Sequence, residues 1–303
     1  MTYGIIKRDP YLSPYEGAID RRVKQYIGKK KEIMGDKPIE DFANGYMYYG
    51  FHRDENGDFV YREWAPSADE MHITGDFNGW DRLSHPMVKK GGNFEIVIDS
   101  AHAPENGSRI KALVTKDGVT TEHIPAYANY VTQDPDDASW CARVHIEDTP
   151  FEWHDQKTRL SHKPMIYECH VGMSSEEGRI ATYREFAENI LPRIRKNGYN
   201  TIQLMAIMEH PFYGSFGYQV SNFFAASSRF GTPDELKYLV NKAHGMGIRV
   251  LLDVVHSHAV GNTLEGINLF DGTSWQFFHE GSKGDHPAWG TKCFNYDKPE
   301  VLH

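Results

Sequence analysis

Ionisable side chains follow three apolar segments of this 303-residue chain, and the clearest case is RVLLDVVHSH at residues 249–258. There an aliphatic run is followed by Asp253, His256 and His258. A run without polar alternation is typical of a strand buried on both faces, as in a parallel sheet. In α/β barrels the active site is built at the carboxyl ends of such strands. The segment therefore predicts a catalytic or binding site at the end of a barrel strand.

Two earlier apolar segments end in the same way. The string MIYECHVG carries Glu168 and His170, and TIQLMAIM runs into Glu209 and His210. We interpret each string as a strand, and we expect their carboxyl ends to meet at one rim. A single carboxylate at a strand end, such as Asp253, has a structural role about as often as a functional one. Carboxylates and imidazoles from three strand ends together favour a functional site.

The His-x-His pair invites a zinc interpretation, but a zinc site needs three or four ligands, and no partner set accompanies His256 and His258. We therefore predict no metal and no cofactor. If His256 has no functional role, we expect it to be a packed, hydrogen-bonded core histidine. Cys141, Cys169 and Cys293 are far apart and odd in number. They give no disulfide framework and favour a reducing compartment.

Helical patterns separate the three strands. Residues 183–196 are amphipathic, and residues 233–247 follow Thr232 as N-cap, with Pro233 in the first helical position. Consecutive strand–helix units predict parallel strands with right-handed crossovers. A doubly wound nucleotide-binding fold is the rival. No strand here leads into G-x-G-x-x-G, however, and no phosphate-binding G-x-x-x-x-G-K-[ST] string is present.

The first half of the chain follows different patterns. Residues 11–34 carry apolar side chains at helical spacing, whereas residues 46–146 consist of short strand-like runs separated by turn signals. Those signals are Asn56-Gly57, Asn78-Gly79, Gly91-Gly92 and Asp117-Gly118. Regular strands with such turns predict an antiparallel β-sandwich of about 100 residues.

Composition narrows the possible partners. A net charge of −9 disfavours nucleic acid and anionic membranes, which need a basic surface. No apolar run is long enough to span a membrane, and the N-terminus has no signal-peptide core. We expect a soluble, cytoplasmic protein. Aromatic residues make up 13%, which suits stacking on sugars, although aromatic side chains more often fill cores and interfaces.

Several strings carry a family resemblance. DVVHSH, GSFGYQVSNFFAASSRFG and the subsequent TPDEL resemble the alpha-amylase superfamily. MIYECHVG, QLMAIMEHPFYGSFGYQ and EWAP with GDFNGW are more specifically similar to the 1,4-alpha-glucan (glycogen or starch) branching enzymes. The resemblance implies an N-terminal helical segment at 1–45, an immunoglobulin-like, glycan-binding β-sandwich at 46–150 and the first three units of a catalytic (β/α)8 TIM barrel at 151–303. It further implies α-1,4-glucan (glycogen, starch or amylose) as the partner.

The resemblance also implies roles for individual residues. Tyr218 should stack under the sugar on the non-reducing side of the scissile bond, and His258 should bond the 6-hydroxyl of that sugar. Asp253 should orient neighbouring groups, and Asn222 should line the same pocket. Further glucan contacts are implied for Trp64, Ala65, Pro66, Trp80, Lys111, Glu300, Val301, Leu302 and His303. Trp64 could instead be a core residue of the sandwich.

The reacting groups are missing from this sequence. A retaining mechanism needs a carboxylate nucleophile and a separate acid/base. The family takes them from an F-R-F-D-G string and a later glutamate, and neither is present. Asp253 and Glu209 match positions that bind or orient substrate instead. We therefore expect this chain to be the front part of a branching enzyme and to be inactive alone. We also expect the barrel side chains of Leu204, Leu252 and Val254 to be uncovered and the edge of the sheet to be prone to aggregation.

Two other functions remain open. The chain could be a non-catalytic α-glucan-binding fragment, holding glucan through its sandwich alone. It could also belong to a debranching enzyme, because such enzymes pair a similar sandwich with the barrel, although the EHPFYGSFGYQ string argues against this.

Overall fold

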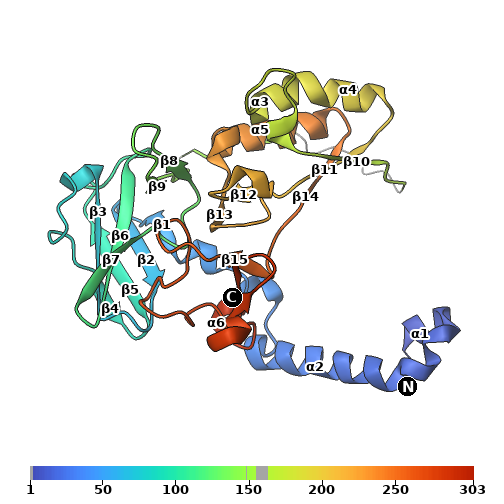
Figure 1. Cartoon of the computed structure of the whole chain (residues 1–303), viewed down its shortest axis with the longest axis horizontal. Coiled ribbons are helices and arrows are strands. Elements are labelled where there is room, and N and C mark those ends of the chain that lie inside the picture. Colours follow the sequence, from blue (N-terminus) through green and yellow to red (C-terminus); the bar gives the residue numbers. More distant parts are fainter. Residues whose placement is uncertain (1–2, 148, 155–162) are drawn as a thin grey trace. The chain divides into compact units, whose positions relative to one another are not determined.

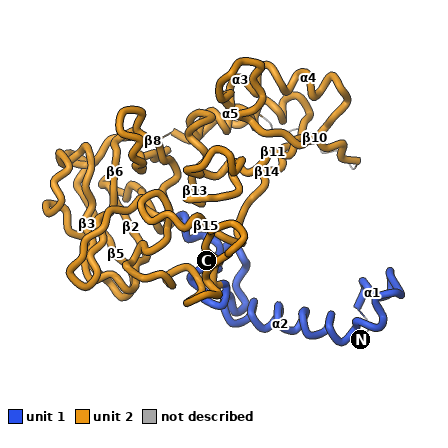
Figure 2. Tube along the Cα trace, in the orientation of Figure 1, with its two compact units in different colours: residues 1–47, 296–303 blue, residues 48–295 orange. Residues whose placement is uncertain are grey.

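The computed structural model describes residues 3–147, 149–154 and 163–303. Its chain falls into two compact units, shown in Figure 2: residues 1–47 with 296–303, and residues 48–295. The second unit holds both the predicted sandwich and the predicted strand–helix segment. The proposed domain limits at 45/46 and 150/151 stay predictions.

The first unit is helical. Its elements are α1 (Gly4–Arg8), η1 (Pro10–Tyr15), α2 (Glu16–Met34), η2 (Ile39–Asp41), η3 (Gly45–Met47) and α6 (Pro299–Leu302). The helical pattern over residues 11–34 corresponds to η1 followed by α2. Helix α2 ends at Gly35, whose φ of 59° lies in the region that glycine adopts without strain. The Gly35 amide donates to the Lys31 carbonyl at 2.9 Å, which closes the last turn.

The second unit begins with a β-sandwich, as the turn signals predicted (Figure 1). Its strands are β1 (Gly50–Arg53), β2 (Phe59–Trp64), β3 (Glu70–Gly75), β4 (Val88–Lys90), β5 (Asn93–Ile98), β6 (Arg109–Lys116), β7 (Val119–His123), β8 (Val131–Gln133) and β9 (Trp140–Arg143), with η4 (Asp76–Asn78) after β3. One sheet has the order β1-β2-β5-β4. The other has the order β3-β6-β9-β8, with β7 also paired to β6. All of these pairings are antiparallel.

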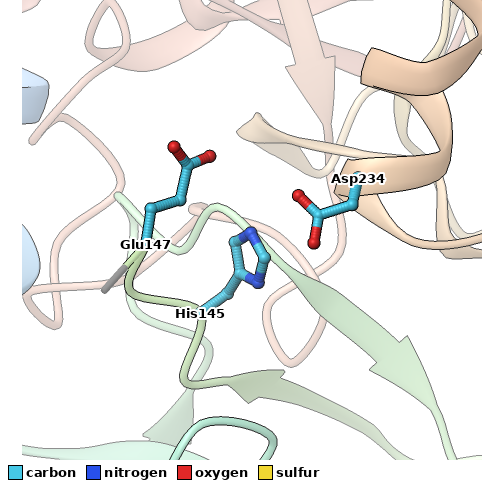
Figure 3. Close-up of side chains that lie close together, drawn as sticks. All are labelled: His145, Glu147 and Asp234. Atoms are coloured by element: carbon cyan, nitrogen blue, oxygen red, sulfur yellow. The ribbon is translucent and has the colours of Figure 1, made fainter. Parts of the chain in front are cut away.

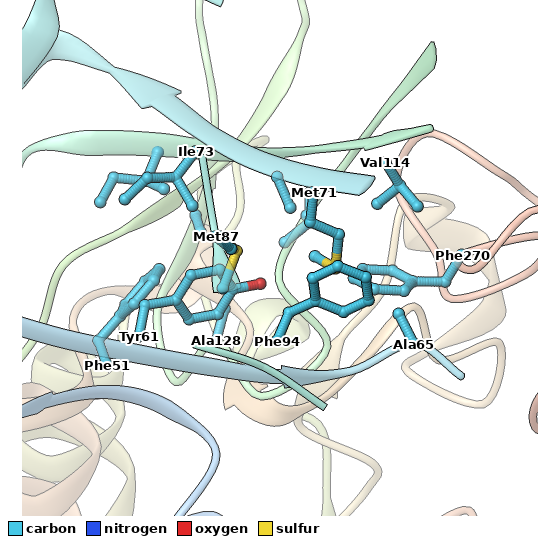
Figure 4. Packing of buried hydrophobic residues seen from close by; sticks show 14 of the residues in the cluster. Phe51, Tyr61, Ala65, Met71, Ile73, Met87, Phe94, Val114, Ala128 and Phe270 are labelled. Atoms are coloured by element: carbon cyan, nitrogen blue, oxygen red, sulfur yellow. The ribbon is translucent and has the colours of Figure 1, made fainter. Parts of the chain in front are cut away.

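The sandwich core forms where the inward faces of these two sheets meet. Met71 and Ile73 on β3 face Phe51, Tyr61 and Phe94 from the opposite sheet (Figure 4). Side chains two residues apart on a strand share a face, so alternate positions supply this layer. The result is an apolar interior that is closed on both sides.

The strand–helix segment follows. Strands β10 (Ile166–Cys169), β11 (Thr201–Leu204) and β14 (Arg249–Leu252) pair in parallel in that order. The connecting helical elements are η5 (Val171–Met173), α3 (Tyr183–Glu185), the π-helical η6 (Phe186–Ile190), α4 (Leu191–Lys196), η8 (Ser228–Phe230) and α5 (Pro233–Gly245). Thr232 caps α5 as predicted: its hydroxyl accepts the Glu235 amide at 3.2 Å, and the Glu235 carboxylate accepts the Thr232 amide.

Short pairs complete the second unit. Strands β12 (Met208–Glu209) and β13 (Asn222–Ala226) pair antiparallel, with η7 (Tyr213–Ser215) between them. Strands β15 (His258–Val260), β16 (Asp285–His286) and β17 (Thr291–Cys293) form a further sheet in the order β15-β17-β16, with η9 (Gly281–Gly284) preceding β16. Within the described ranges we find no helix long and apolar enough to span a bilayer.

Three sequence-based expectations were wrong. The predicted strand over residues 201–208 stops at Leu204, because Met208 and Glu209 turn away to pair with β13. Leu204 itself is fully buried, because β11 lies between β10 and β14 and packs into an apolar cluster with the helices. His256 is exposed and is no core histidine, because β14 ends at Leu252 and the chain leaves the sheet there.

Candidate functional site

The carboxylate of Asp253 is the centre of the predicted site, immediately after β14. Gln203 on β11 donates its side-chain amide to Oδ1 of Asp253 at 2.8 Å. The hydroxyl of Tyr218 donates to Oδ2 at 2.7 Å. Two neutral donors therefore fix both oxygens of one half-buried carboxylate, which is how a protein orients such a group.

Tyr218 and His258 also lie together. The Nε2 atom of His258 lies 2.9 Å from the Tyr218 carbonyl oxygen, which can only accept, so Nε2 is the donor there. Burial, and next the hydrogen bond to Asp253, raise the pKa of Tyr218 to about 12, so the phenol keeps its proton at neutral pH. The structure thus brings together Tyr218, Asp253 and His258, three residues that the family resemblance assigns to one site.

A glycine makes this approach possible. Gly217 has a φ of +87°, and a Cβ at that position would lie 1.7 Å from the Ala206 carbonyl oxygen. Any larger residue would push the loop away from Ala206, which follows β11. Glycine is therefore required at position 217 of the FGY string, because the Tyr218 loop closely contacts Ala206 after β11.

A cavity of about 630 Å³ opens beside these residues, in the size range of small-molecule sites. Its lining comprises Ser215, Tyr218, Gln219, Val254, Val255, His256, Ser257, His258 and Trp289. Trp289 was missed by the sequence analysis. It lies 31 positions beyond His258, and only the pairing of β15 with β17 and of β17 with β16 brings it back beside that residue.

Other predicted residues lie outside this lining. Asn222 is buried, and its Oδ1 accepts the Ser221 hydroxyl at 2.9 Å. Its Nδ2 has no hydrogen-bond partner among the residues that the structure describes. Glu168 is exposed on β10, and His170 is buried with its Nδ1 accepting the Met173 amide. The three strand ends therefore do not all converge on one cavity.

Glu209 has a structural position. It is fully buried and accepts the Ser228 amide at 2.7 Å and the Ser227 hydroxyl at 3.1 Å. The Arg229 guanidinium lies 3.9 Å away. Burial raises the pKa of Glu209. With its oxygens used to hold the loop after β13, this carboxylate is not presented to a ligand.

In the sandwich, Trp64 ends β2 and is half-buried. Its ring meets that of Phe277 edge-on at 5.5 Å, and its carbonyl accepts the Gln276 side-chain amide. Ala65 is fully buried in the core, so neither its methyl group nor its backbone is presented to a ligand, whereas Pro66 is exposed. Trp64 therefore packs partly against the protein interior and leaves part of its side chain exposed to solvent.

Lys111 belongs to the other sheet, and Trp80 lies in the turn after η4, which follows β3. Lys111 on β6 donates its ammonium to Oε2 of Glu122 at 3.0 Å. Trp80, at a positive φ of 65°, donates its indole N–H to Asp76 at 3.2 Å, and the Arg109 guanidinium lies 5.5 Å from its ring. Both side chains are thus ordered by polar contacts.

The four predicted C-terminal contacts lie in the first unit. Glu300, Val301 and Leu302 are in α6, and the ring of His303 meets Phe42 edge-on at 5.3 Å. Their roles stay predictions.

One group of side chains has the composition of a metal site. Ligand atoms of His145, Glu147 and Asp234 lie within 4.8 Å of one another (Figure 3). The Lys237 ammonium, however, is ion-paired with Glu147 and lies 3.7 Å from Asp234. A cation is therefore already present between the two carboxylates, and we assign no metal to them.

Comparisons with known proteins agree with this architecture. A family model for carbohydrate-binding module 48 (isoamylase N-terminal domain) matches residues 48–128, and one for the alpha amylase catalytic domain matches residues 189–297. The structure of a pullulanase from Bacillus acidopullulyticus matches 84% of this chain and 35% of that chain, with a TM-score of 0.66 and 20% identity. The two family models, together with this likeness in fold, support a β-sandwich followed by part of an alpha-amylase-type barrel.

The sequence matches are stronger. The chain is 46% identical to the 1,4-alpha-glucan-branching enzyme of Yarrowia lipolytica, over 100% of this chain and 45% of that protein. It is 47% identical to the 1,4-alpha-glucan-branching enzyme of Solanum tuberosum, over 99% of this chain and 36% of that protein. The resemblance seen in the sequence is confirmed, and the chain spans less than half the length of these relatives.

Proposed function

We propose that this chain is the glucan-binding and substrate-orienting part of a 1,4-alpha-glucan-branching enzyme, which cleaves α-1,4 linkages and forms α-1,6 branches. The observation that carries the proposal is the hydrogen-bonded group of Tyr218, Asp253 and His258 beside a cavity at the end of β14. Relatives of that name match the whole chain. The cytoplasm is the proposed compartment, because Cys141, Cys169 and Cys293 are unpaired thiols.

The side chains suit a neutral sugar. The Tyr218 ring offers an apolar face to the CH face of a glucose residue. Because Nε2 of His258 donates to the Tyr218 carbonyl, its Nδ1, 3.1 Å from the Ser257 hydroxyl, is the nitrogen that would accept a sugar 6-hydroxyl. Asp253, held at both oxygens, would orient neighbouring groups and would not attack the sugar.

The chain contributes binding without supplying the reacting pair. Retaining glycosidase chemistry needs two carboxyl groups roughly 5 Å apart, one of them free to form a covalent intermediate. Asp253 has its oxygens engaged by Gln203 and Tyr218, and Glu209 is buried and engaged by the loop after β13. Neither is placed to react.

The sandwich provides a second, separate glucan contact in this proposal. Trp64 and Pro66 lie at the end of β2, Lys111 lies on the other sheet, and Trp80 lies in the turn after η4. The match to carbohydrate-binding module 48 supports an α-glucan ligand for this region. The proposed partner is therefore α-1,4-glucan at two places in the second unit.

Affinity electrophoresis in gels that contain glycogen tests the binding. We expect the chain to be retarded, with weaker retardation for Trp64→Ala and Trp80→Ala and a further loss for Tyr218→Ala. The Tyr218→Phe variant is the matched control, because it keeps the ring and loses only the bond to Asp253. A chain that migrates identically with and without glycogen would refute the proposal.

A non-catalytic glucan-binding fragment is the second candidate, favoured by the engagement of both internal carboxylates. The iodine spectrum of amylose separates the two. The chain alone should leave the spectrum unchanged in either case. A polypeptide that continues this chain through the remaining barrel strands should shift it, and His258→Ala in that polypeptide should abolish the shift. No shift for the longer polypeptide would favour the binding fragment.

A further inference from the structure

The indole of Trp289 is an exposed aromatic surface in the cavity beside Tyr218. Its side chain is 57% exposed, although tryptophan is among the largest apolar residues. It lines the cavity together with Tyr218 and His258. An exposed aromatic ring inside a concave site is a common feature of ligand recognition.

The indole is held in a defined orientation. It stacks on the imidazole of His286, with ring centroids 4.4 Å apart and an interplanar angle of 5°. Because His286 covers one face, the exposed surface belongs to the other face and the ring edge. The ring also meets His258 edge-on at 4.9 Å, which ties it to the predicted sugar-binding histidine.

The backbone around Trp289 is equally constrained. The residue lies in the turn between β16 and β17, where the Trp289 and Gly290 amides donate to the His286 carbonyl at 3.2 and 2.9 Å. Gly290 has a φ of +63°, which the turn requires. The side-chain amide of Gln219, the residue after Tyr218, contacts the Trp289 carbonyl at 3.4 Å. Tyr218 and Trp289 are therefore connected through the contact between the Gln219 side chain and the Trp289 carbonyl.

We propose that Trp289 is a second stacking platform for an α-1,4-glucan in this cavity, binding a sugar residue next to the one on Tyr218. This inference rests on the proposed function and extends it. Ordering the indole in advance removes part of the entropy cost of binding, because the ring need not be immobilised by the sugar. A linear glucan presents an apolar CH face on each residue, so two rings in one cavity select a chain over a single glucose.

Calorimetric titration with maltoheptaose tests this proposal in the Trp64→Ala/Trp80→Ala background, where the sandwich contacts are removed. Adding Trp289→Ala should weaken the remaining binding about fivefold or more, the effect of roughly 1 kcal/mol of lost stacking. Trp289→Phe should keep most of the affinity, since a ring remains. Trp153→Ala removes another exposed tryptophan, outside the cavity lining, and should change nothing.

Three results would overturn the inference. The first is that Trp289→Ala binds within about twofold of the background, while Tyr218→Ala loses binding. The second is that the background binds no maltoheptaose, although the unsubstituted chain does; the sandwich alone then binds glucan. Both leave α-glucan binding by this chain intact. The third is that the unsubstituted chain binds no maltoheptaose, and only this result removes the proposed function as well. Thermal unfolding of each variant verifies that it is folded.

Discussion

The sandwich and the parallel sheet use similar apolar residues but bury them to different extents. In the sandwich, Phe59, Tyr61 and Phe94 are all at most 1% exposed, because a facing sheet covers each strand. In the parallel sheet the middle strand β11 is covered, whereas Leu252 at the end of β14 is 46% exposed. A strand is thus only as buried as its neighbours make it. The closed region can supply stability, and the open region supplies a rim where a cavity forms.

The largest expected effect separates the two regions directly. Phe94→Ala in the sandwich should lower the free energy of unfolding by about 3–5 kcal/mol, because it leaves a cavity in a closed core. Leu252→Ala should cost less than about 1 kcal/mol, since much of that side chain is already in water. Chemical denaturation of both variants measures this. Equal losses would contradict the difference in burial described above.

A buried carboxyl gives the sandwich a pH dependence. Glu63 on β2 is fully buried, and it accepts hydrogen bonds from the Tyr61 hydroxyl and from the Ala126 and Trp64 amides. Burial nevertheless raises its pKa from 4.5 to about 7. Between these values the folded state retains a proton that the unfolded chain releases. Stability therefore falls as pH rises from 4.5 to about 7 and is level above that.

The Glu63→Gln variant should lack this dependence. The difference in unfolding free energy between variant and wild type should change by about 3 kcal/mol from pH 4.5 to pH 8, at roughly 1.4 kcal/mol for each unit of pKa. His123 acts in the opposite direction, because burial lowers its pKa from 6.5 to about 4 and stability is lost as pH falls through that range. It is present in both proteins and cancels in the difference. Parallel pH profiles would show that Glu63 is ionised in the fold.

A substitution at the exposed edge of the parallel sheet should have the smallest effect on stability and the clearest effect on self-association of the chain. Leu252 and Val254 are exposed at one side of the parallel sheet, and Ile166 and Tyr167 are exposed on β10 at the other. Exposed apolar edge strands promote pairing between chains. Leu252→Lys should leave the unfolding free energy within about 0.5 kcal/mol of wild type and reduce self-association in light scattering. An unchanged scattering profile would show that this edge does not mediate association.

Much of this arrangement could be predicted from the sequence, and the exceptions have physical reasons. The change from strand-rich to strand–helix patterns and the cap at Thr232 follow from local strings, whereas the grouping of Tyr218 with Asp253 and His258 was implied by the family resemblance. Gln203 did not stand out, because a single amide in an apolar strand gains its role only when β11 pairs with β14 beside Asp253. Register is a property of paired strands, and one sequence segment does not contain it.

Trp289 was missed for a related reason. Its surroundings, HPAWGTK, give a turn signal and no chemistry. The β15-β17-β16 sheet determines that this turn lies over His258. Leu204 was assigned the wrong exposure because its burial depends on β11 lying between β10 and β14 and packing with the helices. His256 was assigned the wrong exposure because the predicted strand was too long: β14 ends at Leu252, and the residues after it leave the sheet.

Hydrogen exchange of the chain with and without maltoheptaose, resolved by peptide mass spectrometry, tests most directly whether the open region is a glucan site in its own right. We predict slower exchange in peptides that cover residues 214–219 and 254–260, in addition to those around Trp64 and Trp80. Protection confined to the sandwich, with the ends of β14 and the Tyr218 loop unchanged at saturating ligand, would contradict this account.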